Sequence, residues 1–77
     1  FFDSKTIFQE MVQGNFAGEI SYHLLGEEGP DHNKTFSVEV CIGEKAMGQG
    51  QGRTKKAAEQ MAAYHGIMAL QAGDVCI

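Results

Sequence analysis

Glycine at every second position, directly before an alanine-rich segment, is the feature that most constrains how this chain folds. Gly48, Gly50 and Gly52 occupy every second position and lead straight into a predicted helix that begins at about residue 53. Glycine at such positions lets the backbone turn tightly or approach a ligand closely. The segment 48–63 therefore predicts an extended stretch that leads straight into a helix.

Three cations lie at the beginning of that helix: Arg53, Lys55 and Lys56. The N-terminus of a helix carries unpaired N–H groups and the positive end of the helix dipole, so cations there are unfavourable for the helix itself. We expect a negative group to bind at this point, and phosphate is the usual candidate. The net charge of −4 argues against nucleic acid as a partner. However, half of the six Lys and Arg residues fall within 53–56, and this local cluster argues for it.

The length and composition of the chain predict one small packed domain. Its 77 residues are 43% hydrophobic with one Pro, which argues against disorder. We expect residues 1–77 to form a single domain, with a core over about 3–71 and a tail over 72–77. Cys41 and Cys76 are far apart and lack metal-ligand spacing, so we expect free thiols in a reducing compartment. No apolar run approaches the roughly 18 residues of a membrane span, and the abrupt beginning suggests a domain cut from a longer protein.

Five segments have the periodicity of helices or strands. In chain order they are a helix over 4–14, strands over 19–26, 34–42 and 45–50, and a helix over about 53–71. Asp3 or Ser4 can cap the first helix, and residues 27–33 have the composition of a loop. Three sequential strands with short links predict an antiparallel meander. The expected fold class is therefore α+β in the order α-β-β-β-α, a three-stranded antiparallel sheet with both helices packed on one face.

The two predicted helices have different faces. The first has an apolar stripe made of Ile7, Phe8, Met11 and Val12. Opposite it lies a polar ribbon at helical spacing, made of Thr6, Gln9, Glu10 and Gln13. The second helix has a stripe of mostly small residues that let it lie close to the sheet: Ala58, Ala62, Ala63, Gly66, Ile67 and Leu70. Lys55, Lys56 and Glu59 continue this stripe and cannot all be buried as charges, so we expect the first turn to extend past the edge of the sheet.

Four segments carry a resemblance to a known family. They are KTIFQEMVQ over 5–13, GPDHNKTF over 29–36, VEV over 38–40 and GQGQGRTKKAAEQMAA over 48–63. In this order and spacing, over roughly residues 3–70, the chain resembles a double-stranded-RNA-binding domain. The form that it resembles most is the C-terminal domain of bacterial ribonuclease III.

The resemblance implies a three-part RNA footprint. The first helix is expected to contact one minor groove through Thr6, Gln9 and Glu10. The loop between the first two strands is expected to reach a second minor groove through Gly29, Pro30, Asp31 and His32. The beginning of the second helix is expected to bind phosphates across the intervening major groove through Arg53, Thr54, Lys55 and Lys56. Because A-form RNA hides its base edges in a deep, narrow major groove, recognition of shape, 2′-hydroxyls and phosphates fits each role.

Three positions depart from the family pattern. Glu59 stands where many members have a third lysine, although the ribonuclease III branch commonly has Glu. Thr54 replaces a more frequent Ser and keeps the hydroxyl. Gly66 replaces the usual Ala, at a cost to the helix of up to about 1 kcal/mol. The net charge of −4 and the small basic cluster predict weak to moderate binding that is sensitive to salt.

Two functions remain open. The first is a non-catalytic module that binds double-stranded RNA for a ribonuclease III-like endoribonuclease active in RNA processing, rRNA included. Its Mg²⁺ and the carboxylates that hold it would then belong to a catalytic domain outside this chain, and the domain itself would need no cofactor or metal. The second is a protein-interaction or dimerisation module without RNA binding. Intact Glu10, His32, Lys55 and Lys56 favour the first. The resemblance further implies a cytoplasmic location, no membrane partner, a homodimeric parent protein and a monomeric isolated domain.

Each feature also has an ordinary structural explanation. Lys55 and Lys56 fit a solvated helix face, the polar ribbon fits the solvent side of the first helix, and His32 fits an inert loop residue. We interpret His23 and His65 as structural. The three His and two Cys share no metal-ligand spacing, so a zinc site is not expected.

Overall fold

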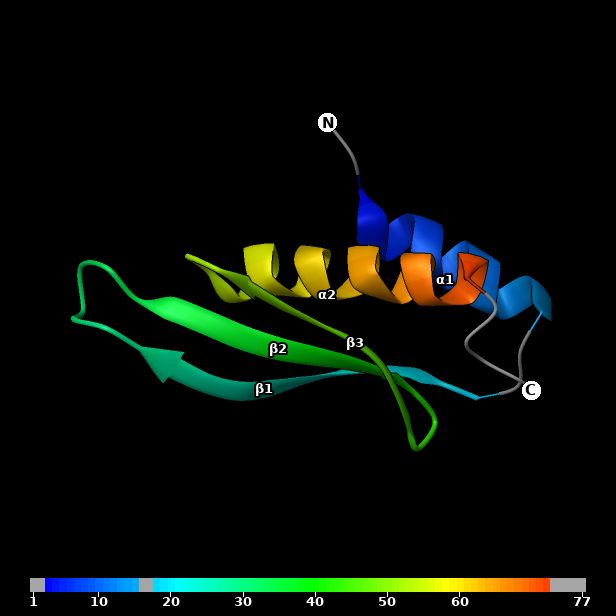
Figure 1. The fold of residues 1–77 in the computed structure, drawn as a ribbon, viewed down its shortest axis with the longest axis horizontal. Helices are drawn as coiled ribbons and strands as arrows, with labels where there is room; N and C mark the ends of the chain where they lie inside the picture. The colour runs from blue at the N-terminus through cyan, green and yellow to red at the C-terminus, as the bar shows by residue number, and fades with distance from the viewer. Residues whose placement is uncertain (1–2, 16–17, 73–77) are drawn as a thin grey trace.

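The computed structural model describes residues 3–15 and 18–72. The elements are α1 (Ser4–Asn15), β1 (Ile20–Glu28), β2 (Thr35–Ile42), β3 (Lys45–Gly52) and α2 (Lys55–Gln71). The strands form one antiparallel sheet in the order β1-β2-β3. Figure 1 shows both helices on the same face of this sheet. The expected α-β-β-β-α fold is therefore confirmed.

Two of the three strands, β1 and β3, extend two residues past the ends that their patterns predicted, whereas β2 begins one residue later than predicted. β1 continues through Glu27 and Glu28, because these residues pair with Phe36 and Thr35 of β2, so the predicted loop over 27–33 was wrong at its beginning. A register shift between Leu24 and Gly26 leaves a β-bulge at Leu25. Polar or glycine residues at a strand end do not prevent pairing, and their lack of apolar alternation concealed the extension.

The glycines of β3 face α2 at very short range. A Cβ atom at Gly50 would lie 2.2 Å from the backbone N of Ala62, and one at Gly48 would lie 2.8 Å from the backbone N of Gly66. A Cβ atom at Gly52 would lie 2.7 Å from the Cβ of Ala57. The glycines therefore allow a close approach of the helix, whereas the sequence had suggested a tight turn or the close approach of a ligand. Without side chains on one side of β3, the backbones of strand and helix pack directly together.

The core lies between the sheet and the two helices. Both predicted helical stripes contribute to it: Phe8 and Val12 of α1 are buried, as are Ala58, Ala62, Ala63, Gly66 and Ile67 of α2. From the sheet come Val38, Val40, Ile42 and Met47. Cys41 is a buried free thiol in β2 as expected, whereas Cys76 lies outside the described residues. Among the described residues, no helix is long and apolar enough to cross a membrane.

Gly66 is explained by its contact with Phe8, a fully buried core side chain with 0% exposure. A Cβ atom at Gly66 would lie 2.8 Å from Cε1 and 3.0 Å from Cζ of the Phe8 ring. We expect Gly66→Ala to lower the free energy of unfolding by about 1 kcal/mol, because overpacking a core costs about 1–3 kcal/mol and the gain in helix propensity is about 1 kcal/mol. Thermal or urea unfolding measures this difference.

The same substitution in a Phe8→Leu variant tests whether the Phe8 ring causes this loss of stability. In Phe8→Leu the ring is gone, so Gly66→Ala should become neutral or stabilising relative to Phe8→Leu alone. Equal destabilisation by Gly66→Ala in both backgrounds would show that the ring is not what excludes a side chain from this position.

Candidate nucleic-acid interface

The beginning of α2 is an exposed basic cluster. Thr54 is the N-cap: its backbone is extended and its hydroxyl oxygen accepts a hydrogen bond from the Ala57 N–H at 3.0 Å. Arg53, Lys55 and Lys56 are all exposed, and the first helical turn contains no acidic residue. Within residues 3–15 and 18–72, neither lysine has an acidic partner. The cations and the helix dipole thus concentrate positive charge at one point of an acidic domain.

The β1–β2 loop projects from one end of the sheet. Gly29 has a φ of +99°, and its neighbour Pro30 accepts a hydrogen bond from the Asn33 N–H at 2.8 Å, which closes a tight turn. Pro30, Asp31 and His32 are exposed on this turn. Lys34 donates to Glu27 Oε1 at 3.0 Å and lies 3.7 Å from Asp31 Oδ1. The loop is therefore held at its base by an ion pair, and its tip faces solvent.

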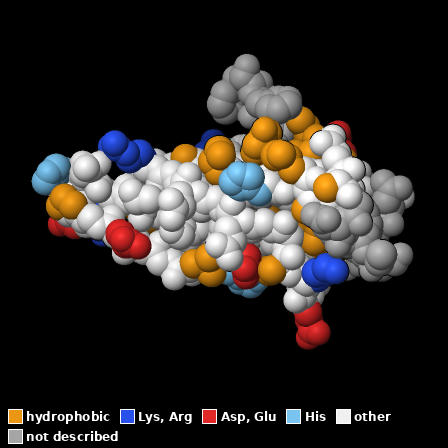
Figure 2. Space-filling view, viewed as in Figure 1, with side chains coloured by type: hydrophobic (Ala, Val, Ile, Leu, Met, Phe, Trp, Pro, Cys, Tyr) orange, Lys and Arg blue, Asp and Glu red, His pale blue; other side chains and the backbone are white. Residues whose placement is uncertain are grey.

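The sheet register brings this loop and the beginning of α2 to the same end of the molecule. Thr35, directly after the loop, begins β2, and its neighbour Phe36 pairs with Gly52, the last residue of β3. The chain then enters the cluster of Arg53, Lys55 and Lys56. Figure 2 shows basic and His side chains at this end, on the left of the view, with acidic side chains below them. Two of the three predicted contact regions are therefore neighbours because of strand pairing.

The third region is the polar face of α1. Thr6, Gln9 and Glu10 are all exposed and have the spacing of one helix face. The Thr6 hydroxyl donates to Asp3 Oδ2 at 2.8 Å, and the Thr6 N–H donates to Asp3 Oδ1 at 3.3 Å. Of the two expected caps of this helix, Asp3 therefore fills the role, whereas Ser4 is buried.

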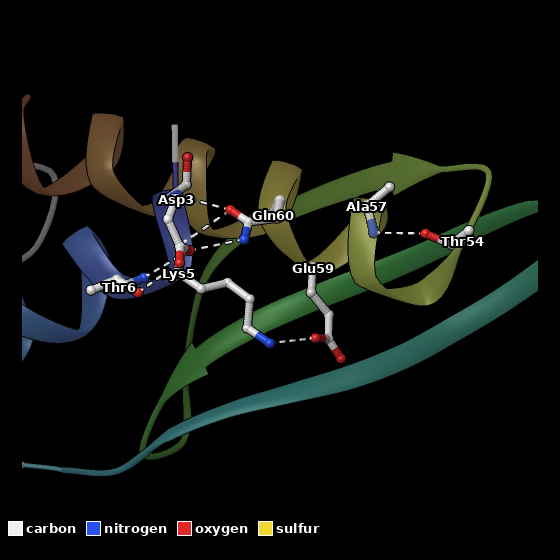
Figure 3. Close-up of polar contacts among 8 residues, drawn as sticks. Asp3, Lys5, Thr6, Thr54, Ala57, Glu59 and Gln60 are labelled. Atoms are coloured by element: carbon white, nitrogen blue, oxygen red, sulfur yellow. Dashed lines mark hydrogen bonds and ion pairs between the residues drawn. The ribbon is translucent and has the colours of Figure 1, made fainter. Parts of the chain in front are cut away.

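Two contacts from α2 hold the beginning of α1, as Figure 3 shows. The Gln60 side-chain carbonyl accepts from the N–H groups of Ser4 and Lys5 at 2.8 and 3.3 Å, and its NH₂ donates to Asp3 Oδ1 at 2.9 Å. Lys5 Nζ forms an ion pair with Glu59 Oε1 at 2.6 Å. Glu59 and Gln60 follow Lys56 by three and four residues, so α1 is fixed about one helical turn from the basic cluster.

The role of Gln60 was not predicted from the sequence, and Glu59 was placed in an overhanging turn and at the position of a family lysine, without a partner. Glu59 is half-buried against Lys5, whose ammonium also lies 4.9 Å from the centroid of the Tyr22 ring. Partial burial, together with the charges of Glu59 and Asp3, raises the pKa of Tyr22 to about 12. The hydrogen bonds that Asp3 accepts, first from Gln60 and then from Thr6, hold the pKa of its carboxyl below the ordinary value. No periodicity predicts such pairs, because their members are more than 50 residues apart.

The remaining polar groups of residues 3–15 and 18–72 do not form a metal site. Among the described residues, no group of three or more His, Cys, Asp or Glu side chains could hold a metal ion. The ring of His65 donates a hydrogen bond to the backbone carbonyl of Gln49, and His23 lies on the exposed outer face of the sheet with its Nε2 3.1 Å from Ser21 Oγ. These contacts support the structural interpretation of both histidines.

The sequence matches one family model and several curated proteins. The family model described as double-stranded RNA binding motif matches residues 4–70. A protein of Caldanaerobacter subterraneus subsp. tengcongensis named ribonuclease 3 is 50% identical over 68 residues, 88% of this chain and 30% of that protein. Proteins of the same name from Latilactobacillus sakei and Pelotomaculum thermopropionicum are 47% and 45% identical over 91% and 96% of this chain. The chain spans about 30% of the length of these curated relatives.

Proposed function

Because the chain belongs to the double-stranded RNA binding motif family, we propose that it binds duplex RNA by shape, through two minor-groove contacts and one major-groove phosphate clamp. The observation that carries this proposal is the position of the exposed cations at the beginning of α2, beside the β1–β2 loop. Exposed cations beside a polar loop suit a ligand with charged ridges and polar grooves in alternation, which is the surface of A-form RNA.

The clamp consists of Arg53, Thr54, Lys55 and Lys56. The Thr54 oxygen caps α2, and its hydroxyl hydrogen remains to donate to a phosphate oxygen. The lysine ammonium groups donate to phosphates as point charges without a fixed geometry, which tolerates any base sequence. Binding through this cluster therefore depends on salt and not on sequence.

The two minor-groove contacts come from α1 and from the β1–β2 loop. In α1 the contacting side chains are Thr6, Gln9 and Glu10, and in the loop the contacting residues are Gly29, Pro30, Asp31 and His32. Amide, carboxylate, hydroxyl and imidazole groups all form hydrogen bonds with a 2′-hydroxyl. Because DNA lacks that hydroxyl, these contacts select RNA over DNA.

The longer relatives indicate the setting of this domain. They are named ribonuclease 3 and are about three times as long as the chain, so we place catalysis, with its Mg²⁺ and carboxylates, in a domain outside this chain. In that arrangement the domain delivers duplex RNA to a cytoplasmic double-strand-specific endoribonuclease, which acts as a homodimer while the isolated domain is a monomer. Two linked domains per dimer raise the avidity of a weak RNA contact. A dimerisation module without RNA binding is not favoured, because the family match and the exposed cluster at Lys55 and Lys56 both point to RNA.

Fluorescence anisotropy with labelled 20-mers tests the proposal, the probe being slightly longer than the roughly 16 base pairs that such domains span. Duplex RNA, duplex DNA and single-stranded RNA are titrated at two salt concentrations. We expect duplex RNA to bind best, with an affinity that falls as salt rises and does not change with base sequence. Equal affinity for duplex RNA and duplex DNA would refute the minor-groove contacts. Failure to bind all three would support an interaction module instead.

A further inference from the structure

A continuous chain of hydrogen bonds runs from α2 to the surface of α1. It begins at Gln60, passes through the Asp3 carboxylate and ends at the Thr6 hydroxyl, over distances of 2.9 and 2.8 Å. Figure 3 shows these residues side by side with their contacts as dashed lines. The two ends of this series of hydrogen bonds differ in exposure: Gln60 is half-buried between the helices, whereas Thr6 faces solvent.

The donors and acceptors in this series of hydrogen bonds fix the direction of each one. The N–H groups of Ser4 and Lys5 only donate, so the Gln60 oxygen must face them. The Gln60 NH₂ must then face the Asp3 carboxylate, which only accepts when ionised. Both acceptor and donor are needed at Gln60: a carboxylate would lack the donor and an ammonium would lack the acceptor. An amide of this length is the side chain that satisfies α1 and Asp3 together.

The hydrogen bond from Thr6 to Asp3 determines whether the Thr6 hydroxyl acts as a donor or an acceptor toward a ligand. Its one hydroxyl hydrogen is donated to Asp3 Oδ2, so the oxygen presents only lone pairs to solvent. An RNA 2′-hydroxyl can donate to that oxygen. A deoxyribose presents a C–H group at the same place and cannot.

We propose that Gln60 is a positioning residue for RNA recognition, which holds Asp3 so that Thr6 is fixed as a hydrogen-bond acceptor for a 2′-hydroxyl. The inference rests on the proposed function and adds to it a residue that does not contact RNA. Gln60 lies one turn after the phosphate clamp in α2, so the same side chain also sets the position of the α1 contact relative to the α2 contact.

The test is a double-mutant cycle of Gln60→Met and Thr6→Val, read as the ratio of the affinities for duplex RNA and duplex DNA. Met matches the length of Gln without its polar atoms, and Val matches the shape of Thr without its hydroxyl. We expect Gln60→Met to lower the ratio by roughly fivefold, the effect of about one hydrogen bond. In the Thr6→Val background the same change should alter the ratio by less than about twofold, because the acceptor that it positions is absent.

Three controls separate positioning from a general loss of structure. Gln51→Met removes a glutamine that donates to Ser37 Oγ on the outer face of the sheet, and it should leave the ratio unchanged. The salt dependence of Gln60→Met should equal that of the wild type, because the cations of α2 are intact. An NMR titration should show the pKa of Asp3 rising toward its ordinary value in Gln60→Met, since the hydrogen bond that lowers it most is gone.

The possible outcomes are distinct. If the wild type does not prefer duplex RNA over duplex DNA, the proposed function itself fails. If the wild type does prefer duplex RNA, two results would overturn the positioning role alone. One is that Gln60→Met keeps the wild-type ratio of affinities, and the other is that Gln60→Met lowers this ratio equally with and without Thr6→Val. Should Gln60→Met fail to fold, Asp3→Ala breaks the same chain at an exposed residue, and an unchanged ratio there overturns the role equally.

Discussion

Replacing Gly50 by alanine should cost the domain a large part of its stability. The added Cβ atom would lie 2.2 Å from the backbone N of Ala62 and 2.5 Å from the carbonyl carbon of Met61, and neither is a flexible side chain that could rotate away. Overpacking costs about 1–3 kcal/mol and occasionally more, and we expect about 3 kcal/mol or more here because strand and helix backbones must separate. A domain of this size has about 4–12 kcal/mol in total. Calorimetry should show a fall in Tm of roughly 12–24 °C.

Gly26→Ala is the matched control. Gly26 lies in β1, where an added Cβ atom would have nothing within 4 Å and φ is not positive. This change should be neutral or stabilise the domain by up to about 1 kcal/mol, since alanine restricts the unfolded chain more than glycine does. Similar losses at both positions would mean that backbone flexibility, and not the approach of α2 to β3, explains the glycines. A larger loss at Gly50 than at Gly48 or Gly52 would support the order of the contact distances.

The glycine series also shows how far sequence reasoning reaches. Alternate glycines predict that something comes close to one side of a strand, but they do not say what comes close. The sequence contained the answer in a second pattern, because the alanine stripe of α2 has small residues at matching positions, Ala58 and Ala62. Two facing surfaces without large side chains pack together. The alanine stripe predicted that this helix lies close to the sheet, but it did not say which strand the helix meets, and the glycines did not say that their neighbour is a helix.

Element order and helix faces could be predicted because each depends on local periodicity. Phe8 and Val12 are buried and Gln9 and Glu10 are exposed, as their spacing indicates. The bulge at Leu25 could not be predicted from the strand pattern. The pattern placed Leu24 on the same side as Ile20 and Tyr22, but Leu24 is 44% exposed. The contacts of Gln60 with Asp3 and of Lys5 with Glu59 depend on how α1 crosses α2, and that is fixed by packing around Phe8 and not by any local pattern.

Removing the two lysines of the clamp should nearly abolish RNA binding and leave the fold intact. In Lys55→Ala with Lys56→Ala, two charge-assisted hydrogen bonds to phosphate are lost, at about 1.5 kcal/mol each, so the affinity for duplex RNA should fall roughly 100-fold. The slope of log affinity against log salt should become shallower by about one for each lost phosphate contact. Anisotropy titrations of the same duplex over a range of salt concentrations measure both quantities.

The stability of this double variant should move in the opposite direction to its affinity. The lysines oppose the dipole of α2, and alanine is the better helix former, so Tm should stay equal or rise. Lys45→Ala removes an exposed cation from the first residue of β3, roughly 25 Å along the strand from the clamp, and should leave the salt slope unchanged. With a net charge of −4, the rest of the domain repels RNA, so binding depends on the local cluster. Unchanged affinity in the double variant would therefore remove α2 from the interface, whereas equal losses in Lys45→Ala would indicate attraction by total charge alone.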